Sequence, residues 1–184
     1  MTTKTRQIAD AHALREAIRA MALAAADLAP DPERAAIVGI RTLGVPLAEA
    51  IHEIILKEKG WELPMGQLDI TLYRDDLGQR HSQPVVRPTR LDFDLTDRTI
   101  LLVDDVLYTG RTVRCALDQL MDYGRPRAIR LVVLVDRGLR EMPIQADVAG
   151  LSLETTDDQT VEVRLGGGLR KDGIWVCPHG AAVP

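Results

Sequence analysis

The chain has 184 residues, 46% of them apolar and 3% aromatic, and it carries a net charge of −4. This length fits one domain over residues 1–184, with a core made mainly of Leu, Val, Ile and Ala. The acidic balance argues against broad, non-specific affinity for nucleic acid, and no apolar run approaches the roughly 20 residues that span a bilayer.

Two features of the sequence bear on its compartment. Residues 1–6 include basic residues, but no apolar secretion segment follows them. The two cysteines, Cys115 and Cys177, are typical of reduced thiols in the cytoplasm, although the sequence leaves a disulfide between them open. We therefore expect a cytoplasmic protein without a membrane segment.

Helical and strand-like patterns alternate along the first part of the chain. Apolar residues three or four apart predict an amphipathic helix from about residue 8 to residue 29, ended by Pro30. A buried strand at 36–40, a helix at 45–59 and an alternating strand at 67–73 follow.

The segment from about residue 73 to residue 95 is charged and has no regular pattern. Connections of this length are commonly functional, so we interpret it as a lid that closes over a substrate and excludes water. Its candidate contacts are Arg74, Arg80 and Arg90.

Residues 100–112 form the most informative stretch. Four apolar residues predict a buried strand that ends at Asp104-Asp105, and Thr109-Gly110-Arg111-Thr112 then opens an amphipathic helix. A helix start favours an anion, Gly110 lets a ligand approach the backbone, and the two threonine hydroxyls add donors for a phosphate. The aspartates would repel that phosphate, so we expect them to face sugar hydroxyls or a cation. An ordinary strand-to-helix turn with a side-chain cap is the simpler alternative.

The remaining pattern completes an α/β fold. A buried strand at 128–135 is followed by a less regular region, 139–184, with short antiparallel strands at 161–165 and 174–177. Strands that alternate with helices predict a doubly wound parallel sheet, and we interpret residues 139–184 as a small mixed β hood.

Polar clusters follow four of the predicted strands. Because ligands bind such sheets beyond the carboxyl ends of the strands, we expect the clusters to share one site. The four are Arg41-Thr42, Tyr73-Arg74-Asp75-Asp76, Asp104-Asp105 and Asp136-Arg137-Gly138.

The central stretch resembles the signature of the type I phosphoribosyltransferases, whose acidic pair binds the ribose of phosphoribosyl pyrophosphate (PRPP) and whose turn cradles its 5′-phosphate. Three further segments, Val38–Gly44, Leu68–Leu77 and Leu134–Gly138, are similar to the PyrR family of that superfamily. The resemblance implies a Mg²⁺-dependent reaction of uracil with PRPP that gives UMP and pyrophosphate. It also implies UMP-responsive binding of pyrimidine operon leader mRNA, which regulates transcription by attenuation.

The resemblance also implies roles for individual residues. Asp104 and Asp105 would be catalytic by holding the ribose diol, and through it the Mg²⁺, while Arg41 would meet the leaving pyrophosphate. Positions that frame the base are matched by Asp136, Arg137 and Val161. The full set matched to PRPP or nucleotide binding is Arg41, Thr42, Asp104, Asp105, Val106, Leu107, Tyr108, Thr109, Gly110, Arg111 and Thr112.

RNA binding would depend on basic surface residues. Leu43, Leu139 and Gln145 replace polar or basic residues of the family, so a uracil phosphoribosyltransferase that serves only in salvage stays open. The candidates for RNA contact are Arg15, Arg19, Arg125, Arg127 and Arg140.

Two further points remain open at this stage. A phosphoribosyltransferase for another base, such as orotate or a purine, is an alternative. Tyr108 argues against a purine, because purine enzymes of this fold carry an aspartate at the matching position. For the assembly, the resemblance implies a homodimer, with a tetramer as the alternative.

Overall fold

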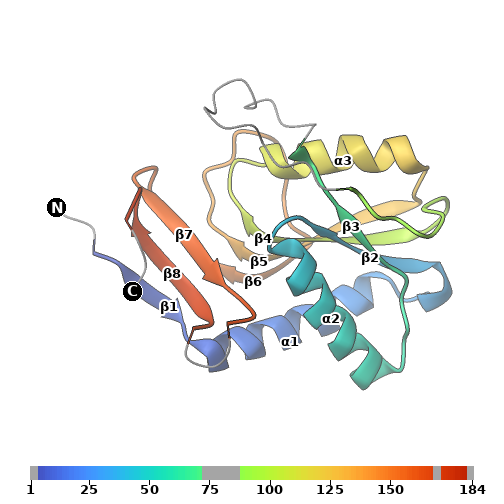
Figure 1. The fold of residues 1–184 in the computed structure, drawn as a ribbon, viewed down its shortest axis with the longest axis horizontal. Coiled ribbons are helices and arrows are strands. Elements are labelled where there is room, and N and C mark those ends of the chain that lie inside the picture. Colours follow the sequence, from blue (N-terminus) through green and yellow to red (C-terminus); the bar gives the residue numbers. More distant parts are fainter. Residues whose placement is uncertain (1–3, 72–87, 168–170, 182–184) are drawn as a thin grey trace.

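The computed structural model describes residues 4–71, 88–167 and 171–181, and its centre is a parallel sheet of five strands. The strands follow the order β3-β2-β4-β5-β6, and each neighbouring pair runs parallel (Figure 1). Their bounds are β2 Ala35–Ile40, β3 Met65–Leu68, β4 Thr99–Leu107, β5 Ala128–Asp136 and β6 Val148–Ser152. The α/β class and the parallel sheet predicted from the sequence are confirmed.

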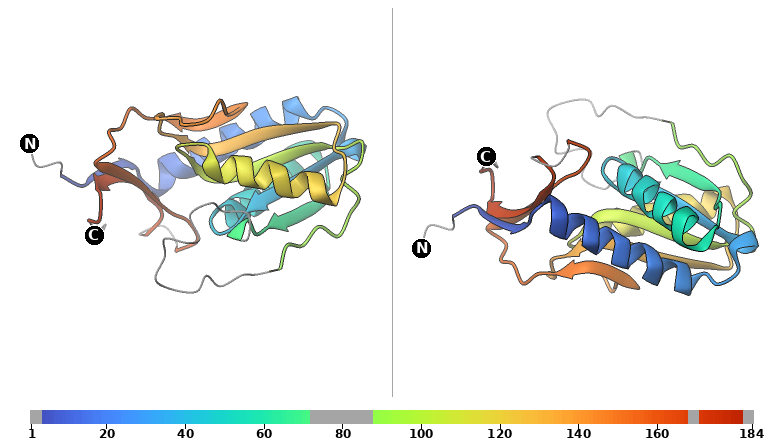
Figure 2. Two further views of the ribbon diagram at one scale, coloured as in Figure 1. Left: turned by 90° about the horizontal axis from the view of Figure 1, so that it is seen from above. Right: turned by 90° about the horizontal axis from the view of Figure 1, so that it is seen from below.

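Helices cover both faces of this sheet, as Figure 2 shows from opposite sides. Helices α1 (Ala11–Leu28) and α2 (Gly44–Lys59) lie on one face, and α3 (Arg111–Tyr123) lies on the other. Because the strands are covered on both faces, they are apolar almost throughout, and β2 is buried at every position.

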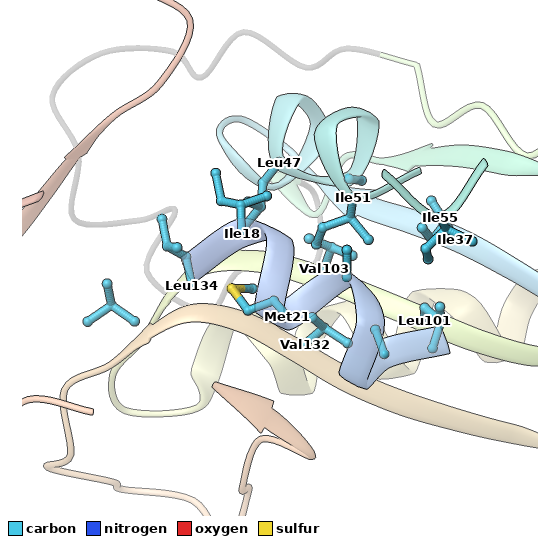
Figure 3. Packing of buried hydrophobic residues seen from close by; sticks show 14 of the residues in the cluster. Ile18, Met21, Ile37, Leu47, Ile51, Ile55, Leu101, Val103, Val132 and Leu134 are labelled. Atoms are coloured by element: carbon cyan, nitrogen blue, oxygen red, sulfur yellow. The ribbon is translucent and has the colours of Figure 1, made fainter. Parts of the chain in front are cut away.

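The larger of the two core clusters lies between the sheet and helices α1 and α2 (Figure 3). Apolar side chains at helical spacing point from both helices onto the middle strands. The residues include Ile18 and Met21 of α1, Leu47, Ile51 and Ile55 of α2, and Leu101, Val103, Val132 and Leu134 of the sheet. The smaller cluster packs α3 against the opposite face, so the sheet is fixed between helices on both of its faces.

A second, smaller sheet stands beside the carboxyl ends of the central strands (Figure 1). It is antiparallel, in the order β1-β8-β7, and we call it the hood. Its strands are β1 Arg6–Ala9, β7 Gln159–Arg164 and β8 Gly173–Pro178. The hood therefore joins the two ends of the described chain.

Near the N-terminus the structure differs from the sequence-based expectation. Ile8, which we predicted inside the first helix, lies in β1. Helix α1 begins at Ala11 because the carboxylate of Asp10 caps it, accepting hydrogen bonds from the backbone N–H groups of His12 and Ala13, both at 2.9 Å.

The bounds of several strands also differ from those predicted from the sequence. Strand β3 covers Met65–Leu68, earlier than the predicted 67–73, and β4 continues through the aspartates to Leu107 because β5 pairs with it along its whole length. Strand β6 was missed, since its residues alternate only weakly; it belongs to the central sheet and not to the predicted hood of 139–184. No helix in the described parts of the chain is long and apolar enough to cross a membrane.

Candidate active site

The acidic pair lies near the carboxyl end of β4, in the middle of the central sheet. The side chain of Asp104 is 5% exposed, Asp105 is half-buried, and the backbone N–H of Asp105 donates to Oδ1 of Asp104 at 3.0 Å. Burial raises the pKa of Asp104 well above its usual value, and the charge of Asp105 raises it further. Burial also raises the pKa of Asp105, although hydrogen bonds from Asp104 and from the backbone oppose this shift. Such a pair favours a ligand that brings hydroxyl donors or positive charge.

The turn after β4 is shaped by Gly110. Its φ of 92° lies in the left-handed region, and a Cβ there would lie 3.3 Å from Cβ of Met142. Gly110 has no side chain that could cap α3. The backbone N–H of Arg111 donates a hydrogen bond to the Thr109 hydroxyl at 3.3 Å. The positive end of the helix dipole thus faces the carboxyl edge of the sheet, which suits a phosphate.

The loop after β2 lies against the acidic pair. A Cβ on Gly44 would lie 2.5 Å from the carbonyl oxygen of Val103 and 3.2 Å from Cα of Asp104, so the start of α2 touches β4. Arg41 donates through Nη2 to Oε1 of Gln67 at 2.5 Å, while its Nε is buried without a partner. The peptide bond between Arg41 and Thr42 is cis, and Thr42 is exposed. The loop that carries Arg41 thus leads to Gly44, which lies against Asp104, while the Arg41 side chain is directed to Gln67 of β3.

At the end of β5, Arg137 joins the signature to the loop between β6 and hood strand β7. It is 5% exposed and donates to the Thr155 hydroxyl and to the Thr156 carbonyl oxygen, both at 3.0 Å. Its guanidinium carbon lies 4.0 Å from the centre of the Tyr108 ring, whose hydroxyl donates to Asp157 at 3.3 Å. Any base contact of Arg137 therefore comes from its backbone, since its side chain is occupied.

The other two residues predicted to frame the base occupy different surroundings. Asp136 pairs in register with Leu107 of β4, and its Oδ1 accepts the backbone N–H of Gly138 at 2.9 Å. Val161 is buried in hood strand β7 as part of the larger apolar cluster. Asp136 thus lies beside the signature, whereas the Val161 side chain packs in the apolar core.

The predicted RNA contacts do not form one surface. Arg15 and Arg19 are exposed on α1, where Arg19 pairs with Glu58 of α2 at 3.1 Å. Arg125 and Arg127 are exposed just before β5, which places them at the sheet edge opposite the acidic pair. Arg140 differs from all four, because its guanidinium is turned inward to backbone carbonyls of the signature.

Two of the three predicted lid contacts, Arg74 and Arg80, lie outside the described residues, as does most of the predicted lid. Arg90 is exposed, and its backbone exchanges two hydrogen bonds of 2.8 Å with Gln67. Gln67 is thus joined both to Arg90 and to the side chain of Arg41.

Sequence reasoning missed the polar run Thr155-Thr156-Asp157-Asp158, which holds Arg137 and Tyr108. The run follows β6, so it is a fifth polar cluster at the carboxyl side of the sheet. It would have been found by the same rule as the other four if β6 had been identified, because only the strand was hard to see.

The sequence profile of the family described as Phosphoribosyl transferase domain matches residues 4–166. Three curated relatives, each named Bifunctional protein PyrR, cover most of both chains. That of Deinococcus radiodurans is 48% identical over 165 residues, covering 90% of each chain. That of Thermus thermophilus is 50% identical over 159 residues, covering 86% of this chain and 88% of the relative. That of Roseiflexus sp. is 48% identical over 174 residues, covering 93% and 94%.

Solved structures agree on the fold. A hypoxanthine-guanine phosphoribosyltransferase from Bacillus anthracis gives a TM-score of 0.67 at 14% identity, covering 97% of this chain and 99% of that one. A hypoxanthine phosphoribosyltransferase from Staphylococcus aureus gives a TM-score of 0.66 at 15% identity, covering 94% and 92%. At such low identity, the likeness concerns the fold alone.

Proposed function

Because this chain belongs to the PyrR family of phosphoribosyltransferases, we propose that its site converts uracil and PRPP into UMP and pyrophosphate. The protein is a uracil phosphoribosyltransferase and has a second role in regulating pyrimidine genes. The observation that supports the catalytic role best is the buried Asp104-Asp105 pair followed directly by the Gly110 turn at the start of α3.

Each part of the site has a task in this reaction. The carboxylates of Asp104 and Asp105 accept the hydroxyl donors of the ribose, and the turn from Val106 to Thr112 holds the 5′-phosphate with backbone N–H groups and threonine hydroxyls. Arg41 and Thr42 lie where the pyrophosphate leaves, and the guanidinium offsets negative charge as the bond from C1′ to the pyrophosphate oxygen breaks.

Uracil is positioned between Asp136-Arg137 at the end of β5 and Val161 of the hood. The bond from C1′ to N1 of uracil forms as the pyrophosphate departs, and the N1 proton is released to water. Since no side chain among the described residues stands out as a general base, we attribute the rate to orientation and electrostatics.

Mg²⁺ would neutralise the diphosphate of PRPP in this site. Asp104 and Asp105 would hold it through the ribose oxygens, because a hard cation prefers oxygen ligands. Within the described residues no group of three or more His, Cys, Asp or Glu could hold a metal by itself, so substrate oxygens and water are needed to complete the coordination.

The first test is release of pyrophosphate that requires uracil, PRPP and Mg²⁺. Asp105→Asn is expected to lower this rate at least a hundredfold, since one charged ribose contact is lost. Asp118→Asn, on the exposed face of α3, is the matched control and keeps the rate. An active Asp105→Asn enzyme would contradict the proposed ribose site, and faster turnover with orotate or hypoxanthine would assign another base.

For regulation, we propose binding of the pyrimidine operon leader mRNA that tightens with UMP. Arg15 and Arg19 on α1 are the first candidate contacts. Arg125 and Arg127, just before β5 at the end of the sheet away from the acidic pair, are the second. All four lie outside the residues assigned to the substrates, so the protein can hold UMP and RNA together.

The RNA proposal is tested by titrating the leader transcript with and without UMP at stated salt concentrations. Arg15→Gln is expected to weaken binding and to reduce the salt slope by about one, as removal of a phosphate contact does. Arg164→Gln in the hood is the control. Binding no tighter than to a scrambled transcript would leave uracil salvage as the sole function and would assign Leu43, Leu139 and Gln145 to that loss.

We also propose a homodimer in the cytoplasm. Both cysteines are buried, and several apolar side chains on the described surface are exposed. The exposed apolar residues are Leu56, Met65, Met121, Tyr123 and Leu139. Sedimentation equilibrium distinguishes the states, because the chain mass is 20.3 kDa: twice that mass supports the dimer, four times the tetramer, and the chain mass alone contradicts both.

A further inference from the structure

We propose that Arg140 is a positioning residue that holds the phosphate-binding turn and the base-binding end of β5 in one arrangement. The proposal rests on the proposed uracil phosphoribosyltransferase site. Arg140 would touch neither substrate and would act through the backbone segments that do.

The contacts of one guanidinium carry this inference. Its Nη1 donates to the carbonyl oxygen of Tyr108 at 2.8 Å and to that of Gly138 at 2.9 Å, with a longer contact of 3.4 Å to Leu107. Its Nε donates to the carbonyl oxygen of Ile144 at 3.0 Å, and its Nη2 forms an ion pair with Oδ2 of Asp136.

These partners belong to separate parts of the site. Leu107 and Tyr108 are the residues just before the Thr109-Gly110 turn, whereas Asp136 and Gly138 belong to the segment that frames the base. Among the described residues, Arg140 is thus the one side chain that hydrogen-bonds to the segment before the turn and to the segment that frames the base, and that also forms an ion pair with the second.

The surroundings make this link stiff. The side chains of Arg140 and Asp136 are each 21% exposed, so their ion pair is only partly screened by water. The backbone adds parallel bonds, because the N–H groups of Glu141 and Met142 donate to the carbonyl oxygen of Thr109 at 3.0 and 3.1 Å. The loop that carries Arg140 is therefore also hydrogen-bonded directly to the Thr109-Gly110 turn.

Arginine suits this position better than lysine. The planar fork reaches carbonyl groups and a carboxylate in different directions at once, which a single ammonium group cannot do. Removing it leaves four carbonyl groups and one carboxylate without this donor, and the turn before Gly110 is then free to shift.

The proposal predicts a KM effect with little effect on kcat. Arg140→Gln is expected to raise the KM for PRPP and for uracil roughly ten- to a hundredfold, because the phosphate-binding turn and the end of β5 are no longer held in the geometry that binds both substrates. The kcat at saturation is expected to stay within about threefold of wild type, since Asp104 and Asp105 are untouched.

Two further variants separate positioning from general stability. Arg140→Lys keeps the charge near Asp136 and is expected to fold, yet it should show the same rise in both KM values. Arg130→Gln is the matched control: Arg130 also pairs with an aspartate, Asp147 at 3.2 Å, but this pair lies at the opposite half of β5. Thermal unfolding of all variants is measured alongside.

The outcomes are distinct. Wild-type KM values in Arg140→Lys, or in a folded Arg140→Gln, would overturn the proposal. Equal KM increases in Arg130→Gln would also overturn it, because the effect would then be one of stability. A wild-type protein that releases no pyrophosphate from PRPP and uracil would instead remove the proposed function.

Discussion

The buried Asp104, which we propose binds the ribose, works against the stability of its own fold. Its carboxyl group has a folded-state pKa well above the ordinary value of 3.8, mainly because it is buried and secondly because Asp105 is charged. Above pH 3.8 the folded state therefore holds more of this proton than the unfolded state does. The free energy of unfolding therefore falls as the pH rises from 3.8 through the folded-state pKa of Asp104, since deprotonation favours the unfolded chain.

A neutral replacement should remove this cost. Asp104→Asn is expected to raise the Tm of the ligand-free protein at pH 8 by a few degrees, since about 1 kcal/mol moves the Tm of a domain of this size by about 2–4 °C. The gain should vanish near pH 3.5, where the aspartate is protonated in both states. Thermal unfolding at both pH values tests this, and a gain that does not change with pH would contradict it.

Single residues also show what a sequence can and cannot predict. The two aspartates and the Gly110 turn could be assigned because their chemistry lies within one contiguous stretch. The role of Arg140 could not be assigned in this way, because its partners come from three segments whose mutual placement only the folded loops decide. The sequence therefore predicts a surface contact with RNA at Arg140, whereas the structure turns its guanidinium inward.

At the scale of elements, the site depends on how closely α2 approaches β4. Gly44 is the first residue of α2, and its Cα faces the carbonyl oxygen of Val103 with no room for a methyl group. The Arg41–Leu43 loop is placed by this contact, which lies one residue before Asp104. The alternation of strands and helices was predictable from apolar periodicity, but this close approach was not, because periodicity says nothing about distance.

Adding one methyl group should move the helix. Gly44→Ala is expected to destabilise the fold by about 1–3 kcal/mol, as overpacking commonly does, and to raise the KM for PRPP because Arg41 is displaced. The measurement is urea unfolding together with steady-state kinetics, and Glu49→Ala on the exposed side of α2 is the control. A Gly44→Ala enzyme with unchanged stability would show that the contact relaxes freely.

The loop that leads from β6 to hood strand β7 is held against the central sheet by Arg137, which donates to Thr155, and by Tyr108, which stacks on Arg137 and donates to Asp157. Tyr108→Leu is expected to cost about 0.5–2 kcal/mol of this attachment and to speed hydrogen exchange in residues 155–159. Tyr108→Phe keeps the ring over Arg137 and loses only the hydroxyl contact to Asp157, so it should show a smaller change. Trp175→Leu, which removes a similar stack with Arg164 inside the hood, should leave this loop unchanged.

At the scale of the whole molecule, the hood depends on both ends of the described chain. Strand β8 lies in its middle, between β1 from the beginning and β7. The sequence predicted β7 and β8, because both alternate over several residues, but β1 is only four residues long and adjoins a strong helical pattern. Long-range pairing of this kind leaves no periodic signal.

Substitution of Gly173 should weaken the pairing of β1 with β8. A Cβ on Gly173 would lie 2.7 Å from the carbonyl oxygen of Ala9, so Gly173→Ala is expected to push β1 away from β8 and to lower stability by about 1–3 kcal/mol. Thermal unfolding and hydrogen exchange of residues 6–9 report the effect, with Lys171→Ala as the control. Unchanged protection of β1 would contradict this view of the hood.

The pairing of β1 with β8 also has a consequence for synthesis on the ribosome. The first strand of the hood is translated well before its partner β8, with the whole central sheet between them. While the central sheet can begin to fold on the growing chain, β1 must wait until β8 has been translated. A nascent chain that stalls before β8 therefore lacks a completed hood beside its central sheet.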